Sequence, residues 1–264
     1  MLKKLAMDIL RWKFGLLGFT ITRGGTRATM GEALRHIRKV GFMPATVIDV
    51  GVAYGTKDLY NVYPEPRYLL VEPLEEYRAT LEKICRRLKG EFVIAAASDQ
   101  TGTVTLNVHD ILSGSSIMRE TDGAAADGKP REVPTVALDA LVKEKKLAGP
   151  FLVKLDTQGA ELLVLAGAVE TLKQTEAVVV EVSLFKFLVG GPQLHDVVGW
   201  MHEHGFHAYD IYGGAQRPLD GSLAQVDVVF AREDGFLRKH HNFATPEQRA
   251  KINKPPRVGD PLLR

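Results

Sequence analysis

The residues of this chain best suited to chemistry are four acids at the ends of apolar segments: Asp49, Glu72, Asp156 and Glu181. A fifth charged residue, Lys154, lies inside the apolar segment 151–156, and side chains two apart on a strand share a face. A buried lysine must find a charged partner or lose its charge, so we expect Lys154 to contact Asp156 or Glu181. Carboxylates gathered at one sheet edge could accept a proton from a hydroxyl. The structural alternative is a buried ion pair that only fixes the strand register.

The segment 47–55, VIDVGVAYG, indicates a ligand-binding turn. It begins as a buried strand containing Asp49 and ends with Gly51 and Gly55, which allow a tight turn and a close approach of a ligand to the backbone. Glu72 follows Gly51 after 21 positions and closes the next apolar segment. An acid at that place can accept two hydrogen bonds from the hydroxyls of a ribose, so the pattern predicts a nucleoside-cofactor site.

The same turn discriminates between two nucleoside cofactors. Dinucleotide-binding folds have G-x-G-x-x-G after the first strand, and the third glycine is missing from this segment. The acid before the first glycine, Asp49, would repel a pyrophosphate and attract a ligand with an ammonium and a sulfonium. The pattern therefore favours S-adenosylmethionine over NAD.

Strand-like and helix-like segments alternate along the chain and must position these residues. Apolar segments predict strands, and segments of helical periodicity predict helices. Strands are expected at 46–50, 68–71, 92–97, 102–108, 133–136, 151–156, 177–182, 206–211 and 226–231; helices are expected at 28–40, 74–88, from 139, at 160–172 and at 194–204. Such alternation predicts a parallel sheet with helices on both faces. Residues 110–130, rich in Ser, Gly, Ala and Asp, are expected to form a mobile loop.

Composition restricts the setting of the protein. The formal net charge of +2 is too small to argue for nucleic acid as a partner. Cys85 is the only cysteine, which excludes an internal disulfide and fits a reducing cytoplasm. No apolar segment approaches the ~20 residues that cross a bilayer. Residues 1–23 have helical periodicity with interspersed basic residues, which predicts a helix packed on the domain or, alternatively, a peripheral helix on an anionic membrane.

The chain is expected to have three parts. A helical cap covers residues 1–44, the domain of alternating strands and helices covers 45–232, and a basic, proline-containing tail covers 233–264. The sequence does not determine an oligomeric state.

Several segments, in this order, resemble the FkbM family of S-adenosylmethionine-dependent O-methyltransferases. They are IDVGVAYG at 48–55, VEP at 71–73, ASD at 97–99, SGSS at 113–116, VPTVALDAL at 133–141, FLVKLDTQGAELLVLAGA at 151–168, VVVEV at 178–182 and DVVFAR at 227–232. The most specific is K-x-D-x-Q-G-A-E followed by V-L-x-G-A. In the first turn, where the family usually has G-A-N-x-G, Val52 and Ala53 replace Ala and Asn.

The resemblance implies a class I methyltransferase (Rossmann-like) fold with a mostly parallel seven-stranded sheet, preceded here by an N-terminal helical extension. It also implies methyl transfer to a hydroxyl of a sugar, glycan or polyketide-type small molecule. The alternatives are an NAD-dependent oxidoreductase and a non-catalytic Rossmann-like binding module.

Site residues follow by position in these motifs. The resemblance implies that the cofactor is bound by Asp49, Gly51 and Gly55 at its methionine end, by Glu72 at its ribose, and by Ser98 and Asp99 near its adenine. It implies acceptor contacts from Ser115, Ser116 and Glu161, and catalytic roles for Lys154, Asp156 and Glu181. His195 is a further acceptor candidate, because it precedes a helix near the ligand edge of the sheet. A divalent cation, Mg²⁺ or Ca²⁺, between Asp156 and Glu181 is a second way to hold the acceptor oxygen, although no third ligand is evident.

Overall fold

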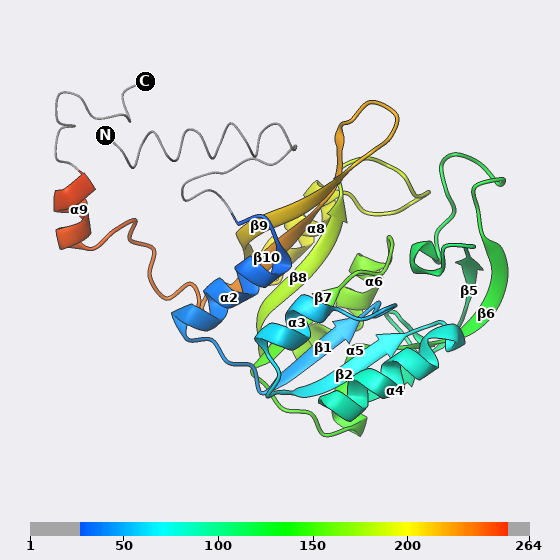
Figure 1. Cartoon of the computed structure of the whole chain (residues 1–264), viewed down its shortest axis with the longest axis horizontal. Helices are drawn as coiled ribbons and strands as arrows, with labels where there is room; N and C mark the ends of the chain where they lie inside the picture. Colours follow the sequence, from blue (N-terminus) through cyan, green and yellow to red (C-terminus); the bar gives the residue numbers. More distant parts are fainter. Residues whose placement is uncertain (1–26, 253–264) are drawn as a thin grey trace, which may run out of the picture.

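The computed structural model describes residues 27–252 and shows an α/β architecture with one large and one small sheet (Figure 1). The large sheet has seven strands in the order β3-β2-β1-β7-β8-β10-β9. Strand β10 runs antiparallel to both its neighbours, and the other pairs are parallel. Its strands are β1 (Thr46–Val50), β2 (Arg67–Glu72), β3 (Lys89–Ile94), β7 (Phe151–Leu155), β8 (Thr175–Ser183), β9 (Phe206–Gln216) and β10 (Leu223–Arg232). The predicted mostly parallel seven-stranded sheet is confirmed.

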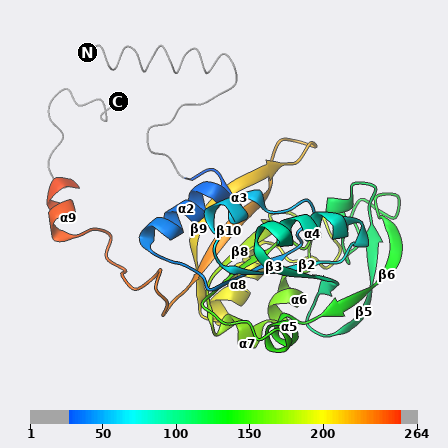
Figure 2. The same cartoon turned by 60° about the horizontal axis from the view of Figure 1, so that its bottom comes forward.

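Helices cover both faces of this sheet, as expected (Figure 2). One layer holds α2 (Met30–Val40), α3 (Lys57–Val62) and α4 (Arg78–Arg87); the other holds α5 (Leu138–Glu144), α6 (Glu161–Ala166), α7 (Val169–Leu172) and α8 (Leu194–Glu203). Alternation along the strands divides the core accordingly, because Val47 packs with the first layer and its neighbour Ile48 with the second. The sheet is therefore buried on both faces, which explains its nearly continuous apolar strands.

Helix α2 shows how sequence signals set the element boundaries. The hydroxyl of Thr29 accepts a hydrogen bond from the Glu32 amide, and the Glu32 carboxylate accepts one from the Ala28 amide. This reciprocal arrangement satisfies amides that have no partner inside the helix. Gly41 ends the helix in the left-handed region, at φ 113°. The helix predicted at 28–40 thus begins two residues later than expected.

Several strands are longer than predicted, and the helix predicted at 74–88 is a 3-10 turn at Glu75–Tyr77 followed by α4. Three further differences concern whether an element exists or is continuous. The six-residue helix α3 was not predicted, because it is too short to show periodicity. The strand predicted at 92–97 is β3, which ends at Ile94, and the next residues form the short β4 (Ala96–Ala97) in the small sheet. The helix predicted at 160–172 is broken into α6 and α7 around Gly167, where a side chain would meet the Ser98 carbonyl oxygen at 2.1 Å.

The small sheet has the order β4-β6-β5, with β5 (Gly102–Val108) and β6 (Lys129–Val136) antiparallel. The segment between them, predicted as a mobile loop over 110–130, contains a 3-10 turn at Leu112–Gly114 and is attached to the large domain. The Thr121 amide donates to the Phe187 carbonyl at 2.8 Å, and the Val189 amide donates to the Arg119 carbonyl at 2.8 Å. These bonds join the segment to the residues that follow β8.

Some predictions concern the ends of the chain. The helix predicted within residues 1–23, with its alternative membrane contact, lies outside the described residues. Helix α9 (Pro246–Ile252) lies in the region predicted as a tail, and its residues are exposed. Within residues 27–252, no helix combines the length and the apolar character that crossing a membrane requires.

Candidate functional site

The turn after β1 packs directly against the end of β7. Gly51 has a φ of 71°, and a β-carbon there would lie 1.8 Å from the carbonyl oxygen of Asp156. Gly55 has a φ of 97°, where an L side chain is also strained. Between them, the amide of Ala53 donates to the Glu72 carboxylate at 2.9 Å. The turn thus connects the ends of β1, β2 and β7 through its backbone, and Ala53 contributes through its amide rather than its side chain.

Asp49 and Lys154 form a buried ion pair beneath this turn. Asp49 is fully buried and accepts hydrogen bonds from the hydroxyls of Tyr60, at 2.6 Å, and Thr56, at 3.2 Å. The Lys154 ammonium lies 3.6 Å from Asp49 and 3.5 Å from Asp156, and it donates to the Gly51 carbonyl at 2.9 Å. Burial alone would lower the pKa of Lys154, but the charges of Asp156 and Asp49 raise it, so the lysine stays charged.

This ion pair changes the interpretation of Asp49. The sequence predicts a carboxylate that touches the cofactor and repels a pyrophosphate, whereas the structure places it under the turn with Lys154 compensating its charge. The repulsion argument against NAD therefore does not hold in that form. Asp49 instead positions the turn. Its ion pair with Lys154 and its hydrogen bonds from Tyr60 and Thr56 hold the backbone at Gly51 in place, because Lys154 also donates to the Gly51 carbonyl.

A first cavity opens above the turn. One wall includes the turn residues Gly51 and Ala53 together with Glu72 and Tyr77. Its apolar wall comes from the large and the small sheet and from the segment after β5; it includes Ala96, Ala97, Leu106, Leu112 and Ile117. Ser98 and Asp99 come directly after Ala97 in the chain, and the Ser98 hydroxyl donates to the Asp99 carboxylate at 3.0 Å. We call this space the turn cavity.

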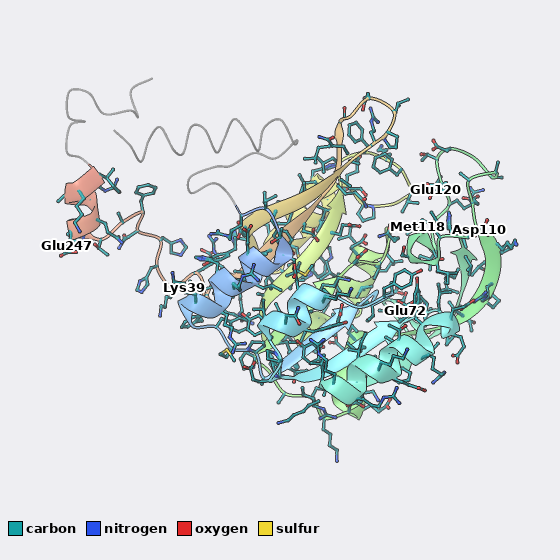
Figure 3. The ribbon with its side chains drawn as sticks, in the orientation of Figure 1. Lys39, Glu72, Asp110, Met118, Glu120 and Glu247 are labelled. Atoms are coloured by element: carbon teal, nitrogen blue, oxygen red, sulfur yellow. The ribbon has the colours of Figure 1, made fainter. Side chains whose placement is uncertain are left out.

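Glu72 stands at the carboxyl end of β2 in the wall of the turn cavity (Figure 3). One carboxylate oxygen accepts from the Leu74 amide at 3.0 Å and the other from the Ala53 amide at 2.9 Å. Burial raises the pKa of Glu72 more than these two amides lower it. Each oxygen keeps a further lone pair, so the side chain can still accept hydrogen bonds from a ligand.

A second, more polar cavity adjoins the first. We call it the carboxylate cavity, because Glu120, Glu161 and Glu181 line it together with Gln158, Gln225 and Phe187. Gln158 lines both cavities. Glu120, labelled in Figure 3, belongs to the segment between β5 and β6 and forms an isolated β-bridge with Leu188.

Two amides hold the carboxylates between the cavities in place. The Gln158 amide donates to Asp156 at 2.7 Å and to Glu181 at 3.1 Å, and the Gln225 amide donates to Glu181 at 3.0 Å. Burial, followed by the charges of Asp156 and Asp227, raises the pKa of Glu181 to about 8. Burial and the charge of Asp156 also raise the pKa of Asp227, to about 6. Such a carboxylate is a stronger base than an ordinary glutamate and can take a proton from a group in the carboxylate cavity.

The remaining predicted site residues lie in different surroundings. Ser115 lines the turn cavity, and the buried Ser116 hydroxyl donates to the Gln158 carbonyl at 2.6 Å. Glu161 is buried, and one of its oxygens accepts from the amides of Thr157 and Gly159, both at 3.1 Å. It therefore organises the turn after β7 as well as lining the carboxylate cavity.

His195 does not join this group. Its side chain is 75 % exposed and lies 3.3 Å from the Asp196 carboxylate at the start of α8. Neither cavity includes it among its lining residues.

Three residues that sequence reasoning missed complete the arrangement: Gln158, Gln225 and Asp227. Gln158 stands inside the quoted K-x-D-x-Q-G motif, which was the available signal. Gln225 and Asp227 are two apart on β10, and Asp227 pairs with Glu181 across the antiparallel β8–β10 contact. Their proximity to Glu181 depends on the insertion of β10 beside β8, which no local pattern indicates.

The donor set does not match the predicted cation between Asp156 and Glu181. Within residues 27–252, no three histidine, cysteine or acidic side chains are grouped to hold a metal ion. The Gln158 amide group donates to both carboxylates at the place where a cation would lie. In this arrangement the Gln158 amide hydrogens, not its carbonyl oxygen, face the two carboxylates, so no third oxygen ligand is presented there.

Comparison with known proteins identifies the domain. The sequence profile of the methyltransferase FkbM domain matches residues 49–208, more than half of the chain. Among curated proteins, no sequence matches significantly.

Similar solved structures include three methyltransferases. The 1,6-didemethyltoxoflavin-N1-methyltransferase of Burkholderia thailandensis, solved with S-adenosylhomocysteine, is 13 % identical, with a TM-score of 0.39 and 76 % of each chain covered. The 23S rRNA methyltransferase ErmE is 10 % identical, with a TM-score of 0.38, covering 81 % of this chain and 72 % of that one. The 16S rRNA methylase ArmA is 11 % identical, with a TM-score of 0.36, covering 77 % and 82 %. These values are too low to assign an acceptor.

Proposed function

The chain belongs to the methyltransferase FkbM family, and we propose that it transfers a methyl group from S-adenosylmethionine to a hydroxyl of a sugar, glycan or polyketide-type small molecule. The observation that carries the proposal is the position of Gln158. It lines both cavities and bonds both Asp156 and Glu181, so the carboxylates lie where two ligands would meet.

The turn cavity has the chemistry that S-adenosylmethionine needs. Glu72 offers carboxylate oxygens for the ribose hydroxyls. The apolar wall of Ala96, Ala97 and Leu106 suits the adenine ring. The glycine conformation at Gly51 lets the turn pack against the carbonyl oxygen of Asp156, so the backbone of the turn lies beside the end of β7, where the methionine end would bind. Ser98 and Asp99 stand beyond the apolar wall and would act near the adenine edge.

The bound cofactor supplies an electrophilic methyl group on a sulfonium. In the carboxylate cavity, Glu181 accepts the hydrogen bond of the acceptor hydroxyl and orients its oxygen, while Asp156, which lines the turn cavity, holds the Gln158 amide that bonds Glu181. As the new C–O bond forms and the S–C bond breaks towards sulfur, Glu181 takes the hydroxyl proton. Lys154 positions both sides, because it holds the Gly51 carbonyl of the turn and the Asp156 carboxylate at once. Alignment of two bound ligands in this way can supply much of the rate.

The lining of the carboxylate cavity supports a neutral, hydroxyl-bearing acceptor. Its acids and amides offer hydrogen-bond partners to hydroxyl groups, and Phe187 offers an apolar face. No lysine or arginine is among the described residues that line this cavity, so nothing there would neutralise a phosphate backbone. We therefore propose a small-molecule or glycan acceptor rather than RNA.

Calorimetry and a methyl-transfer screen test the proposal. S-adenosylhomocysteine should bind and NAD should not; binding of NAD alone would support an oxidoreductase, and binding of neither would support a non-catalytic module. Mass spectrometry should then detect a methyl ether on at least one sugar or polyketide acceptor and none on an RNA oligonucleotide. Asp156→Ala and Glu181→Ala should each reduce transfer, whereas the exposed control Glu203→Ala should not. Full activity in both site variants would remove the catalytic assignment.

A further inference from the structure

Two buried tyrosine hydroxyls, those of Tyr77 and Tyr212, have no hydrogen-bond partner among residues 27–252. Each tyrosine is 3 % exposed. A buried donor without a partner is costly, and such groups are rare in folded proteins. Tyr77 differs from Tyr212 in one respect: it lines the turn cavity, close enough to Glu72 for that charge to act on it.

Tyr77 is held firmly in this position. It ends the 3-10 helix Glu75–Tyr77 after β2, and its amide donates to the Leu74 carbonyl at 3.1 Å. Its ring packs edge-on against Tyr54 of the turn, with the centroids 5.1 Å apart and the planes at 84°. A neighbouring residue, Glu76, is tied to Arg131 of the small sheet at 2.8 Å. The hydroxyl therefore cannot turn away to find another partner without disturbing the cavity wall.

The hydroxyl is a donor. Burial raises the pKa of Tyr77, and the neighbouring hydroxyl of Tyr54 raises it further, so the phenol keeps its proton. The Tyr54 hydroxyl is near enough to act on this pKa, but the Tyr77 hydroxyl has no hydrogen-bond partner, and Tyr54 itself is largely exposed to water. A ligand in the turn cavity is the remaining candidate to accept it.

We propose that Tyr77 donates a hydrogen bond to a ribose hydroxyl oxygen of the cofactor, and that it forms a ribose clamp with Glu72. This proposal rests on the proposed function, since it takes S-adenosylmethionine as the occupant of the turn cavity. The two groups are chemically complementary. Glu72 can only accept hydrogen bonds when ionised, whereas a ribose hydroxyl can donate to Glu72 and accept from Tyr77 at the same time. The sequence marked Glu72 but gave no reason to select Tyr77, because its ring alone satisfies the apolar pattern.

Calorimetry on Tyr77→Phe tests the donated hydrogen bond. We expect S-adenosylhomocysteine to bind about fivefold more weakly than to the wild type, which is the usual range for loss of one neutral hydrogen bond. The unliganded variant should melt at the same or a higher temperature, since a buried unpaired hydroxyl is removed. Higher stability combined with weaker binding is a result that a merely structural role would not give.

Tyr212→Phe is the matched control, because it removes the other unpaired hydroxyl from a place outside both cavities. It should leave the affinity unchanged. Tyr54→Phe should also leave it unchanged, and equal weakening in either variant would overturn the proposal.

Analogues of S-adenosylhomocysteine that lack the 2′ or the 3′ hydroxyl identify the partner atom. The Tyr77→Phe penalty should vanish with the analogue that lacks the contacted hydroxyl, as in a double-mutant cycle. Equal affinity of wild type and Tyr77→Phe for S-adenosylhomocysteine would refute the clamp, as would a penalty that persists with both analogues. Failure of the wild type to bind S-adenosylhomocysteine would refute the proposed function itself.

Discussion

Replacing Glu181 by glutamine removes the proposed base and preserves its contacts. The amide groups of Gln158 and Gln225 both donate to one oxygen of Glu181, at 3.1 and 3.0 Å, and a glutamine oxygen can accept both. The substitution should therefore leave the geometry intact while removing the ability to take a proton. We expect Glu181→Gln to slow methyl transfer by about 10²- to 10⁴-fold, the usual contribution of a positioned general base.

The pH dependence of the wild type gives a second measure. With a pKa of about 8, about a tenth of Glu181 is ionised at pH 7, and most of it above pH 9. The value of kcat/KM should therefore rise nearly tenfold from pH 6 to 7 and level off above pH 8. In Glu181→Gln this rise should disappear. Asp227→Asn should move the midpoint to lower pH, because the charge of Asp227 raises the pKa of Glu181.

The stability of the protein should fall as the pH rises, whereas its activity should increase. An unfolded glutamate loses its proton near pH 4.5, whereas the folded protein holds this one until about pH 8. Between these values the folded state binds more protons than the unfolded state, so the free energy of unfolding falls as the pH rises. The pKa differs by about 3.5 between the folded and the unfolded state. At about 1.4 kcal/mol for each pKa unit, the largest loss in the free energy of unfolding is about 5 kcal/mol. We expect Glu181→Gln to recover about half of this at pH 8.

Initial rates with radiolabelled S-adenosylmethionine, measured from pH 5.5 to 9.5, and urea unfolding at pH 5 and 8 give both quantities. An unchanged pH profile in Glu181→Gln would refute the assignment of the base. Reduced activity without the gain in stability at pH 8 would show that the raised pKa is not a property of the folded site.

Three further perturbations test other parts of the site. Lys154→Met leaves the fully buried Asp49 without its counter-charge and should lower the free energy of unfolding in urea by about 3–5 kcal/mol. Adding Asp49→Asn should restore much of this stability. No restoration would contradict the ion pair. Gly51→Ala should weaken S-adenosylhomocysteine binding more than tenfold by calorimetry, because its β-carbon would meet a backbone oxygen at 1.8 Å. In the control Gly199→Ala in α8, the β-carbon meets nothing within 4 Å, and the protein should be stabilised by about 0.5–1 kcal/mol. Ser116→Ala removes a 2.6 Å hydrogen bond to the Gln158 carbonyl and should raise the acceptor KM about fivefold; a change confined to cofactor affinity would count against this role.

The sequence predicted correctly those strands and helices whose bounds depend on their own residues. Strand β1 has the predicted bounds because all five of its residues are buried, so its apolar run and the strand coincide. Helix α3 was not predicted because six residues are too few to show helical periodicity, and its stability comes from packing of Leu59 and Tyr60 in the core. Strand β3 begins earlier than expected because an edge strand can start with polar residues such as Lys89.

The site was predictable where the chemistry was carried by residue type and by motif. Glu72, Asp156 and Glu181 were selected as acids at strand ends, and they line the two cavities. The partners of Lys154 were only half predictable: Asp156 lies two positions away, but Asp49 reaches it through the register of β1 against β7. Register depends on the packing of the whole sheet, so local sequence does not reveal such a contact.

The position of β10 determines the order in which the chain can fold. Strand β10 lies between β8 and β9, so β9 has no place in the sheet until the later strand has been synthesised. Until residue 232 leaves the ribosome, β8 is therefore an open edge with the almost wholly apolar run Ala177–Val180. Exposed edges of this kind invite pairing with other chains. A chain that ends before β10 should aggregate rather than form a smaller domain, and fusions or truncations should keep the hairpin of β9 and β10 whole.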